Sequence, residues 1–575
     1  MRRLLPLLLL ALLALLASTG ACDRRAAPAP RPEPFSVVEA SIADLRKALD
    51  EGRTTSREVV QQYLTRIALY EDRFNATLHV NPNALSEAAE RDRERASGQL
   101  RGPLHGIPIA LKDNVQTTDM PTTGGAVAFE GLIPPYEATL TKNLRAAGAI
   151  ILAKTTLTEL ANWVAGAPTP MPGNYNALSG YSLNPYDPRR DPRPQTGDGR
   201  PVMGTGGSSS GVGTTLSFWA ANVGTETSGS ILSPANQNML AAVKPTVGRI
   251  SRYGIIPITP DQDTAGPMAR TVADAALLLG VLEGATPDPS DPATKRCTPP
   301  PNHDYTPHLR PDGLRGARIG IPRAFFYAKA AAPGATEPRG GLTPEQLQVM
   351  TEAIEVLRAQ GATIVDPADI PSVLDPDPGA NIMTWGICAG ADEGRGKDDR
   401  CSVVFKYGMK RHFNAWLATL GPAAPVKSLT QLREYNQANA SRGTLKYGQV
   451  VLDISDEMDV ERDRARYEAD RAKDLLLSAT RGIDAAMTAH KLDALLFPGA
   501  SGASIAAKPG YPTVMVPFGT IPNAPTPPLP EGFAARPIPY GVSFTGLACS
   551  EPRLLELAYA FEQATRRRRP PLSAP

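Results

Sequence analysis

Short apolar runs alternate with amphipathic segments along most of the chain. Five runs are short enough for buried strands: Ile107 to Leu111, Ala149 to Ala153, Ile319 to Ile321, Leu492 to Phe497 and Thr513 to Val516. Between them, Thr139 to Ala147 and Val272 to Leu282 have a helical spacing of apolar residues. Strands that are apolar throughout and alternate with helices predict an α/β fold with a largely buried sheet.

Local signals refine this organisation. Thr55 and Glu58 form a predicted capping box before a helical apolar pattern. Residues 167–203 are rich in Pro, Gly and Asn, which predicts an inserted loop that could serve as a lid or rim. We expect a second loop from Ala330 to Gly341 and a peripheral helical cap over residues 392–463. No strong linker divides the chain, so we predict one large domain over residues 39–571.

The first 22 residues have the pattern of an export signal. Arg2 and Arg3 precede the apolar stretch Leu4 to Ala17, and small residues then lead to Cys22. This stretch is shorter than the roughly 20 residues that span a membrane. Ala21-Cys22 resembles a bacterial lipoprotein site, although Thr19 stands where Leu is usual; cleavage without a lipid is the alternative. Residues 23–38 are Pro-rich and predict an extended tether in the periplasm or cell envelope.

The remaining cysteines, the histidines and the charges indicate which disulfides, cofactors and partners to expect. Cys297, Cys388, Cys401 and Cys549 permit two disulfides in an exported chain, and we favour the pairing of Cys388 with Cys401. There is no paired-cysteine motif and the six histidines are scattered, so we expect neither a metal nor an organic cofactor. The net charge is +2 without a basic stripe, which argues against a nucleic-acid partner. We expect the basic run of residues 566–569 to be a solvated tail.

Two Gly/Ser-rich turns carry the first candidate chemistry. Residues 204–211 and 224–231 flank one element, residues 212–223, which has the composition of a folded segment. A Gly/Ser-rich turn can be a linker. Two such turns on either side of one element instead favour a site in which backbone N–H groups converge on an anion. Neither turn contains the lysine of a phosphate-binding loop, which argues against nucleotide binding.

A serine nucleophile in these turns needs a base. No histidine lies in a recognisable motif, whereas Lys112 ends the apolar run of residues 106–112. A lysine at the end of a buried strand can lose its proton and act as a base, although a lysine in this position is ordinarily a surface residue. The residues themselves therefore predict a Ser/Lys hydrolase.

At these positions the sequence resembles the amidase signature family. The similarity runs from about Ser41 to Pro571, and five segments carry it: residues 102–114, 206–211, 224–231, 244–252 and 263–271. Residues 541–551 are similar to the branch that contains bacterial peptide amidases. The resemblance implies a single domain in which helices cover both faces of a mixed central β-sheet.

The resemblance also implies a role for each site residue. Ser230 would be the nucleophile, Ser208 would relay the proton and Lys112 would be the base. The backbone N–H groups of Thr227, Ser228, Gly229 and Ser230 would form the oxyanion hole. A cis peptide bond is expected between Gly207 and Ser208, a form that costs roughly 2.5–4 kcal/mol without proline.

One spacing and two positions depart from the family pattern. Ser208 and Ser230 are 22 residues apart, two fewer than in the family, so the helix expected between them, residues 212–223, or its loop is expected to be shortened. The motif identifies Ser208, with Ser209 and Ser210 as substitutes, whereas the family spacing points to Gly206, which cannot relay a proton. Ser228 stands where many relatives have Gly or Asp, and Leu232 where many have Arg.

The predicted function is hydrolysis of a carboxamide or peptide amide through an acyl-enzyme on Ser230. The alternatives are a catalytically silent protein with the same fold and the subunit of a glutamine-dependent amidotransferase. The substrate is a small-molecule or peptide amide, and the membrane is a partner only through a lipid on Cys22. Four aromatic residues in or beside the inserted loop either form a rim for the substrate or pack the loop onto the body: Trp163, Tyr175, Tyr181 and Tyr186.

Overall fold

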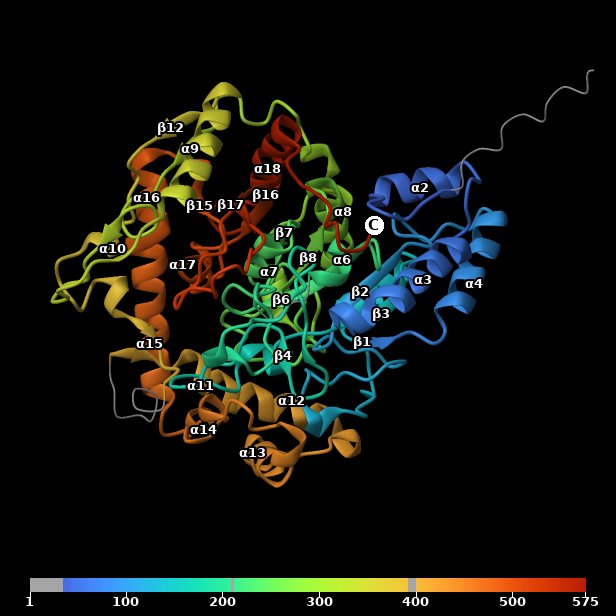
Figure 1. Ribbon diagram of the computed structural model, residues 1–575, viewed down its shortest axis with the longest axis horizontal. Coiled ribbons are helices and arrows are strands. Elements are labelled where there is room, and N and C mark those ends of the chain that lie inside the picture. The colour runs from blue at the N-terminus through green and yellow to red at the C-terminus, as the bar shows by residue number, and fades with distance from the viewer. Residues whose placement is uncertain (1–34, 208–210, 391–399) are drawn as a thin grey trace, which may run out of the picture. The chain divides into compact units, whose positions relative to one another are not determined.

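A mixed β-sheet organises the part of the chain that the computed structural model describes, residues 35–207, 211–390 and 400–575 (Figure 1). Residues 37–575 form one compact unit, in agreement with the predicted α/β domain. In sheet order, the eleven strands are β1 (Thr77–Val80), β3 (Ile150–Thr155), β2 (Pro108–Lys112), β6 (Ala221–Glu226), β8 (Thr264–Ala269), β7 (Ala241–Lys244), β16 (Thr513–Ile521), β17 (Ile538–Thr545), β15 (Ala494–Pro498), β9 (Arg318–Gly320) and β12 (Thr363–Val365). The predicted signal segment, residues 1–22, and most of the tether lie outside the described residues.

Helices surround this sheet. They are α2 (Ile42–Asp50), α3 (Ser56–Phe74), α4 (Ala84–Ala96), α5 (Thr139–Ala146), α6 (Val212–Thr215), α7 (Leu232–Gln237), α8 (Val272–Glu283), α9 (Pro344–Ala359), α10 (Pro371–Leu374), α11 (Val404–Gly408), α12 (Asn414–Thr419), α13 (Leu429–Ala438), α14 (Val450–Asp456), α15 (Arg464–Leu475), α16 (Asp484–His490), α17 (Ala503–Ala507) and α18 (Glu551–Thr565). Helices α8, α9 and α18 pack on the middle of the sheet, and α7 contacts β7, β16 and β17. Among the described helices, none combines the length and apolar character that a membrane span requires.

The apolar pattern located these elements well. All five predicted strands are present as β2, β3, β9, β15 and β16, and the two predicted helices are α5 and α8. The capping box of α3 is also present, because the Thr55 hydroxyl accepts the Glu58 N–H and the Glu58 carboxylate accepts the Thr55 N–H.

The strand register brings three sequence motifs to one edge of the sheet. Strands β2 and β6 are parallel neighbours, with Leu111 opposite Val223, so their carboxyl ends meet. Strand β8 runs antiparallel to β6 with Thr264 opposite Glu226, so the residue before β8 lies beside the residue after β6. Polar residues at the carboxyl ends of β2 and β6 therefore lie close to the residues just before β8.

The helix expected over residues 212–223 is present only as its first turn, in line with the expected shortening of this helix or its loop. Helix α6 ends at Thr215, and the chain turns back before β6 begins at Ala221. The Trp219 ring folds against Gly213, where a Cβ would overlap it. Two buried arginines bind carbonyls at the end of the short helix and in the turn after it: Arg270 donates to Thr214 and Trp219, and Arg66 donates to Leu216.

Two predicted loops have more structure than expected. The ends of the 330–341 segment pair as a small hairpin, β10 (Lys329–Ala330) with β11 (Arg339–Gly340). The inserted region 167–203 contains another, β4 (Tyr175–Asn176) with β5 (Gly180–Tyr181).

The basic run is not the solvated tail that we expected. Arg567 pairs with Glu352 and covers the Phe518 ring, with its guanidinium carbon 4.5 Å from the ring centroid. Arg568 pairs with Glu39, and its side chain is largely enclosed. These contacts join the end of α18 to the body, an arrangement that a local run of charges does not reveal.

Helices α11 to α14 occupy the described part of the segment that we predicted as a helical cap, residues 392–463 (Figure 1). A π-helical turn, residues Met409–Phe413, joins α11 to α12. An apolar cluster packs this region against the loops that follow β2 and β3, and it includes Phe129, Trp163, Phe413 and Trp416.

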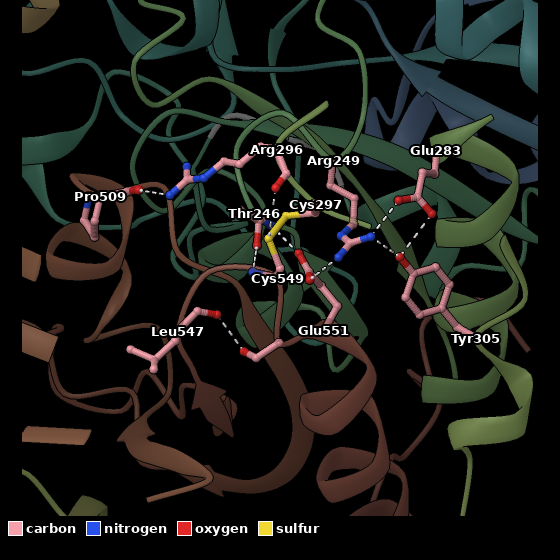
Figure 2. The surroundings of a disulfide bond; sticks show 11 residues. Thr246, Arg249, Glu283, Arg296, Cys297, Tyr305, Pro509, Leu547, Cys549 and Glu551 are labelled. Carbon is pink, nitrogen blue, oxygen red and sulfur yellow. Dashed lines mark hydrogen bonds and ion pairs between the residues drawn. A yellow bond between two sulfur atoms is a disulfide. The ribbon is translucent and has the colours of Figure 1, made fainter. Parts of the chain in front are cut away.

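Two disulfides cross-link the domain. Cys388 pairs with Cys401 as predicted, and Cys297 pairs with Cys549. Figure 2 shows that the second disulfide lies among polar contacts at the start of α18. There, the Glu551 carboxylate accepts the Thr246 N–H at 2.6 Å and pairs with Arg249 at 3.0 Å. The disulfide and these contacts tie α18 to the chain that follows β7.

The two disulfides should contribute unequally to stability. The Cys297–Cys549 bond closes a loop of 252 residues and the Cys388–Cys401 bond one of 13. Loop-closure entropy predicts a loss of about 5 kcal/mol for removing the first and about 3 kcal/mol for the second. We expect the Cys297→Ala/Cys549→Ala variant to have the lower Tm in non-reducing thermal unfolding, with Cys388→Ala/Cys401→Ala as the matched control. The reverse order would contradict this account.

Candidate active site

Lys112 is the buried centre of the candidate site. It ends β2, has no exposed surface, and donates from Nζ to the Thr225 Oγ1 at 2.8 Å and to the Thr225 carbonyl at 3.1 Å. Asn114 donates to the same hydroxyl at 3.0 Å. The parallel register of β2 and β6 makes this contact possible, because it places Thr225 beside the end of β2.

Burial lowers the pKa of Lys112 to about 7, while the more distant Asp263 and Glu226 carboxylates raise it in part. A charged ammonium without water is unfavourable unless a partner compensates it, and the two oxygens of Thr225 are uncharged. Lys154 shows the contrast: it is equally buried, but its Nζ lies 3.1 Å from the Asp113 carboxylate. Lys112 is therefore able to take up and release a proton near neutral pH.

The segment after β6 forms a turn that ends at Ser230. Glu226, buried at the end of β6, accepts the backbone N–H groups of Ile231 at 2.8 Å and Leu232 at 3.0 Å. Gly229 has a φ of 90°, which favours glycine, and its carbonyl accepts the Ser233 N–H at 2.8 Å. The turn is thus fixed at both ends, and Ser230 lies half-buried at its close.

Two residues before β8 hold the start of this turn. The Thr227 hydroxyl donates to the Asp263 carboxylate at 2.6 Å, and Gln262 donates to the Thr227 carbonyl at 3.1 Å. Burial raises the pKa of Asp263 to about 6. On the other side, the Ser228 hydroxyl lies 3.4 Å from that of Ser504, at the start of α17. Backbone groups of residues 227–230 are therefore held in place by neighbours from three elements.

Ser208 and its substitutes Ser209 and Ser210 lie outside the described residues, as does the Gly207–Ser208 peptide bond. The preceding residues are described: a Cβ added to Gly207 would lie 3.6 Å from the Ser230 Cα, and Gly206 packs against the Ser233 carbonyl. Gly207, the last described residue before Ser208, therefore lies beside Ser230.

The structure adds site residues that the sequence reasoning did not single out. Thr225 and Glu226 stand within the serine motif of residues 224–231, and Asp263 begins the motif of residues 263–271, but their partners follow only from the strand register. Within the described chain, no group of three or more His, Cys, Asp or Glu side chains is arranged to hold a metal ion.

The aromatic residues of the inserted region pack the loop rather than form a rim. Trp163 is 6% exposed, donates to Ser455 at 3.0 Å and packs against Phe405. Tyr175 and Tyr181 contact each other with ring centroids 4.9 Å apart, and Tyr186 donates to the Arg569 carbonyl at 2.6 Å.

A family model, a related protein and a crystal structure each match most of this chain. A family model described as Amidase matches residues 58–555. A protein named a probable amidase from Arabidopsis thaliana is 33% identical over 93% of this chain and 92% of its own length. The crystal structure of a native peptide amidase from Stenotrophomonas maltophilia is 37% identical, with a TM-score of 0.75 over 94% of this chain and 99% of that one.

Subunits of glutamyl-tRNA(Gln) amidotransferases are also similar. The one from Chloroflexus aggregans is 37% identical over 57% of this chain and 59% of its own length. The crystal structure of the one from Thermotoga maritima is 19% identical with a TM-score of 0.60, which shows a common fold.

Proposed function

This chain belongs to the amidase family and is an amide-hydrolysing enzyme, and we propose that it cleaves carboxamides through an acyl-enzyme on Ser230. The observation that carries this proposal is the buried amine of Lys112, held by Thr225 on the strand that leads to Ser230. A base with a pKa near 7 is matched to proton transfer at neutral pH.

Each residue then has a defined task. Neutral Lys112 accepts a proton from Ser208 as Ser208 takes the proton of Ser230. The Ser230 oxygen attacks the amide carbonyl, and the N–H groups of residues 227–230 stabilise the oxyanion. Loss of one such donor costs about 2.7–4 kcal/mol in transition-state stabilisation. Ser208 returns the proton to the departing nitrogen, and water then releases the acyl group by the same route.

We propose C-terminal amides of peptides as the substrate class. The support is the similarity to the peptide amidase, which extends over almost the whole of both chains. A primary carboxamide releases ammonia, so the substrate's recognition elements lie on its acyl side. The amidotransferase relatives make glutamine the alternative substrate, for which the same Ser/Lys chemistry would apply.

A fluorophosphonate probe tests the nucleophile without knowledge of the substrate. We expect the probe to modify Ser230, which peptide mass spectrometry of the labelled protein identifies. Ser230→Ala should abolish labelling and amidase activity, and Lys112→Ala should lower both by at least 100-fold, the scale of a general base. Ser86→Ala is the matched control, because it removes a serine hydroxyl at an exposed position of α4, outside the candidate site. Undiminished activity of Ser230→Ala would rule out the acyl-enzyme.

The pH dependence tests the state of Lys112. Because the base must be neutral, kcat/KM should be low where Lys112 is protonated and should rise with pH through about 7. Asp263 raises the pKa of Lys112, so Asp263→Asn should move the midpoint of the profile to lower pH. A profile that is flat from pH 5 to 9, or an upward shift in Asp263→Asn, would be inconsistent with a neutral Lys112.

We also propose export with a lipid on Cys22. Two disulfides in the described chain support an oxidising compartment. In a bacterial host, wild type should incorporate an azide-tagged fatty acid and sediment with membranes, whereas Cys22→Ser should do neither. An unlabelled wild-type protein found free in the periplasm or medium would indicate cleavage without a lipid.

A further inference from the structure

A cavity of about 290 Å³ lies beside the candidate catalytic residues. Its lining includes Asn114, Thr225, Thr227 and Asp263 from the ends of the sheet strands and the turn. Thr225 holds the Lys112 amine, and Thr227 begins the turn that ends at Ser230. A group in this cavity therefore contacts the segment that carries the nucleophile.

The walls of the cavity are mainly apolar and come from two parts of the domain. Tyr136 and Tyr253 stack with ring centroids 5.0 Å apart, and Ile256 and Ile258 extend this wall. A second wall belongs to α12 and the π-helical turn before it, a type of turn that is frequent at functional sites. The Tyr136 hydroxyl lies 2.6 Å from that of Thr419, which joins the two walls.

The charged groups around the cavity are already engaged. Arg252 donates to the Asp291 carboxylate at 2.7 Å, and Asp263 accepts from Thr227 and from the Ile258 N–H. Burial lowers the pKa of His412 to about 4, so this residue is neutral at pH 7. The cavity therefore offers no unpaired charge, among the residues that the structure describes, for a charged side chain.

From these features we infer that the cavity is the subsite for a bulky, uncharged side chain of the residue whose carboxamide is cleaved. The inference rests on the proposed function, because a primary carboxamide leaves only its acyl part to be bound. The volume lies near the lower end of the roughly 300–1,000 Å³ typical of ligand sites, which suits one aromatic side chain.

The ratio of kcat/KM for N-acetylphenylalaninamide to that for N-acetylalaninamide tests this subsite. Wild type should favour the phenylalanine amide. Ala415 lines the cavity from α12 and is exposed, so Ala415→Phe fills the space without disturbing the core. We expect this variant to lower the ratio at least tenfold. Ala418→Phe is the matched control, because it adds the same side chain at another exposed position of α12 and should leave the ratio unchanged.

The outcomes separate the subsite from the catalytic proposal. An unchanged ratio in Ala415→Phe, an equal fall in Ala418→Phe or a wild-type preference for the alanine amide would overturn the subsite. If wild type cleaves neither amide and the fluorophosphonate does not label Ser230, the catalytic proposal itself fails. Labelling of Ser230 without cleavage of either amide would reject the subsite alone.

Discussion

The site depends on one unfavourable interaction, the burial of the Lys112 amine against uncharged oxygens. Within the described chain, both hydrogen bonds of this amine go to Thr225, so its protonated form receives little compensation for the water that it has lost. Burial also lowers the pKa of Lys154 in the same sheet, but there an adjacent carboxylate, that of Asp113, offsets part of this effect. This difference in partners, rather than a difference in burial, makes Lys112 suitable as a base.

The order of the strands explains why this lysine lies near a serine. Parallel pairing of β2 with β6 joins residues more than 100 positions apart, and antiparallel pairing of β6 with β8 adds Asp263. Glu226 then holds the chain at the entry to α7, so that the turn from Thr227 to Ser230 has a fixed course. Such fixed backbone donors are what an oxyanion hole requires, since they need no rearrangement as the charge develops.

Sequence reasoning succeeded where the determining signal is local. Apolar runs identified the buried strands, and Thr55 and Glu58 identified a helix start. It was incomplete or wrong where distant residues decide the structure: Arg66 and Arg270 allow α6 to end after one turn, and Glu39 and Glu352 bind the basic run. Lys112 and Ser230 could be proposed from their motifs, but Thr225 and Asp263 acquire their roles only through the register of the sheet.

Partitioning of the acyl group tests the central claim most directly. If amide cleavage passes through an acyl-enzyme, an amide and an ester with the same acyl group form the same intermediate. With hydroxylamine present, both substrates should therefore give the same ratio of hydroxamate to acid, and mass spectrometry after rapid quenching should find the acyl group on Ser230. Ratios that depend on the leaving group, with no acylated Ser230, would contradict the account.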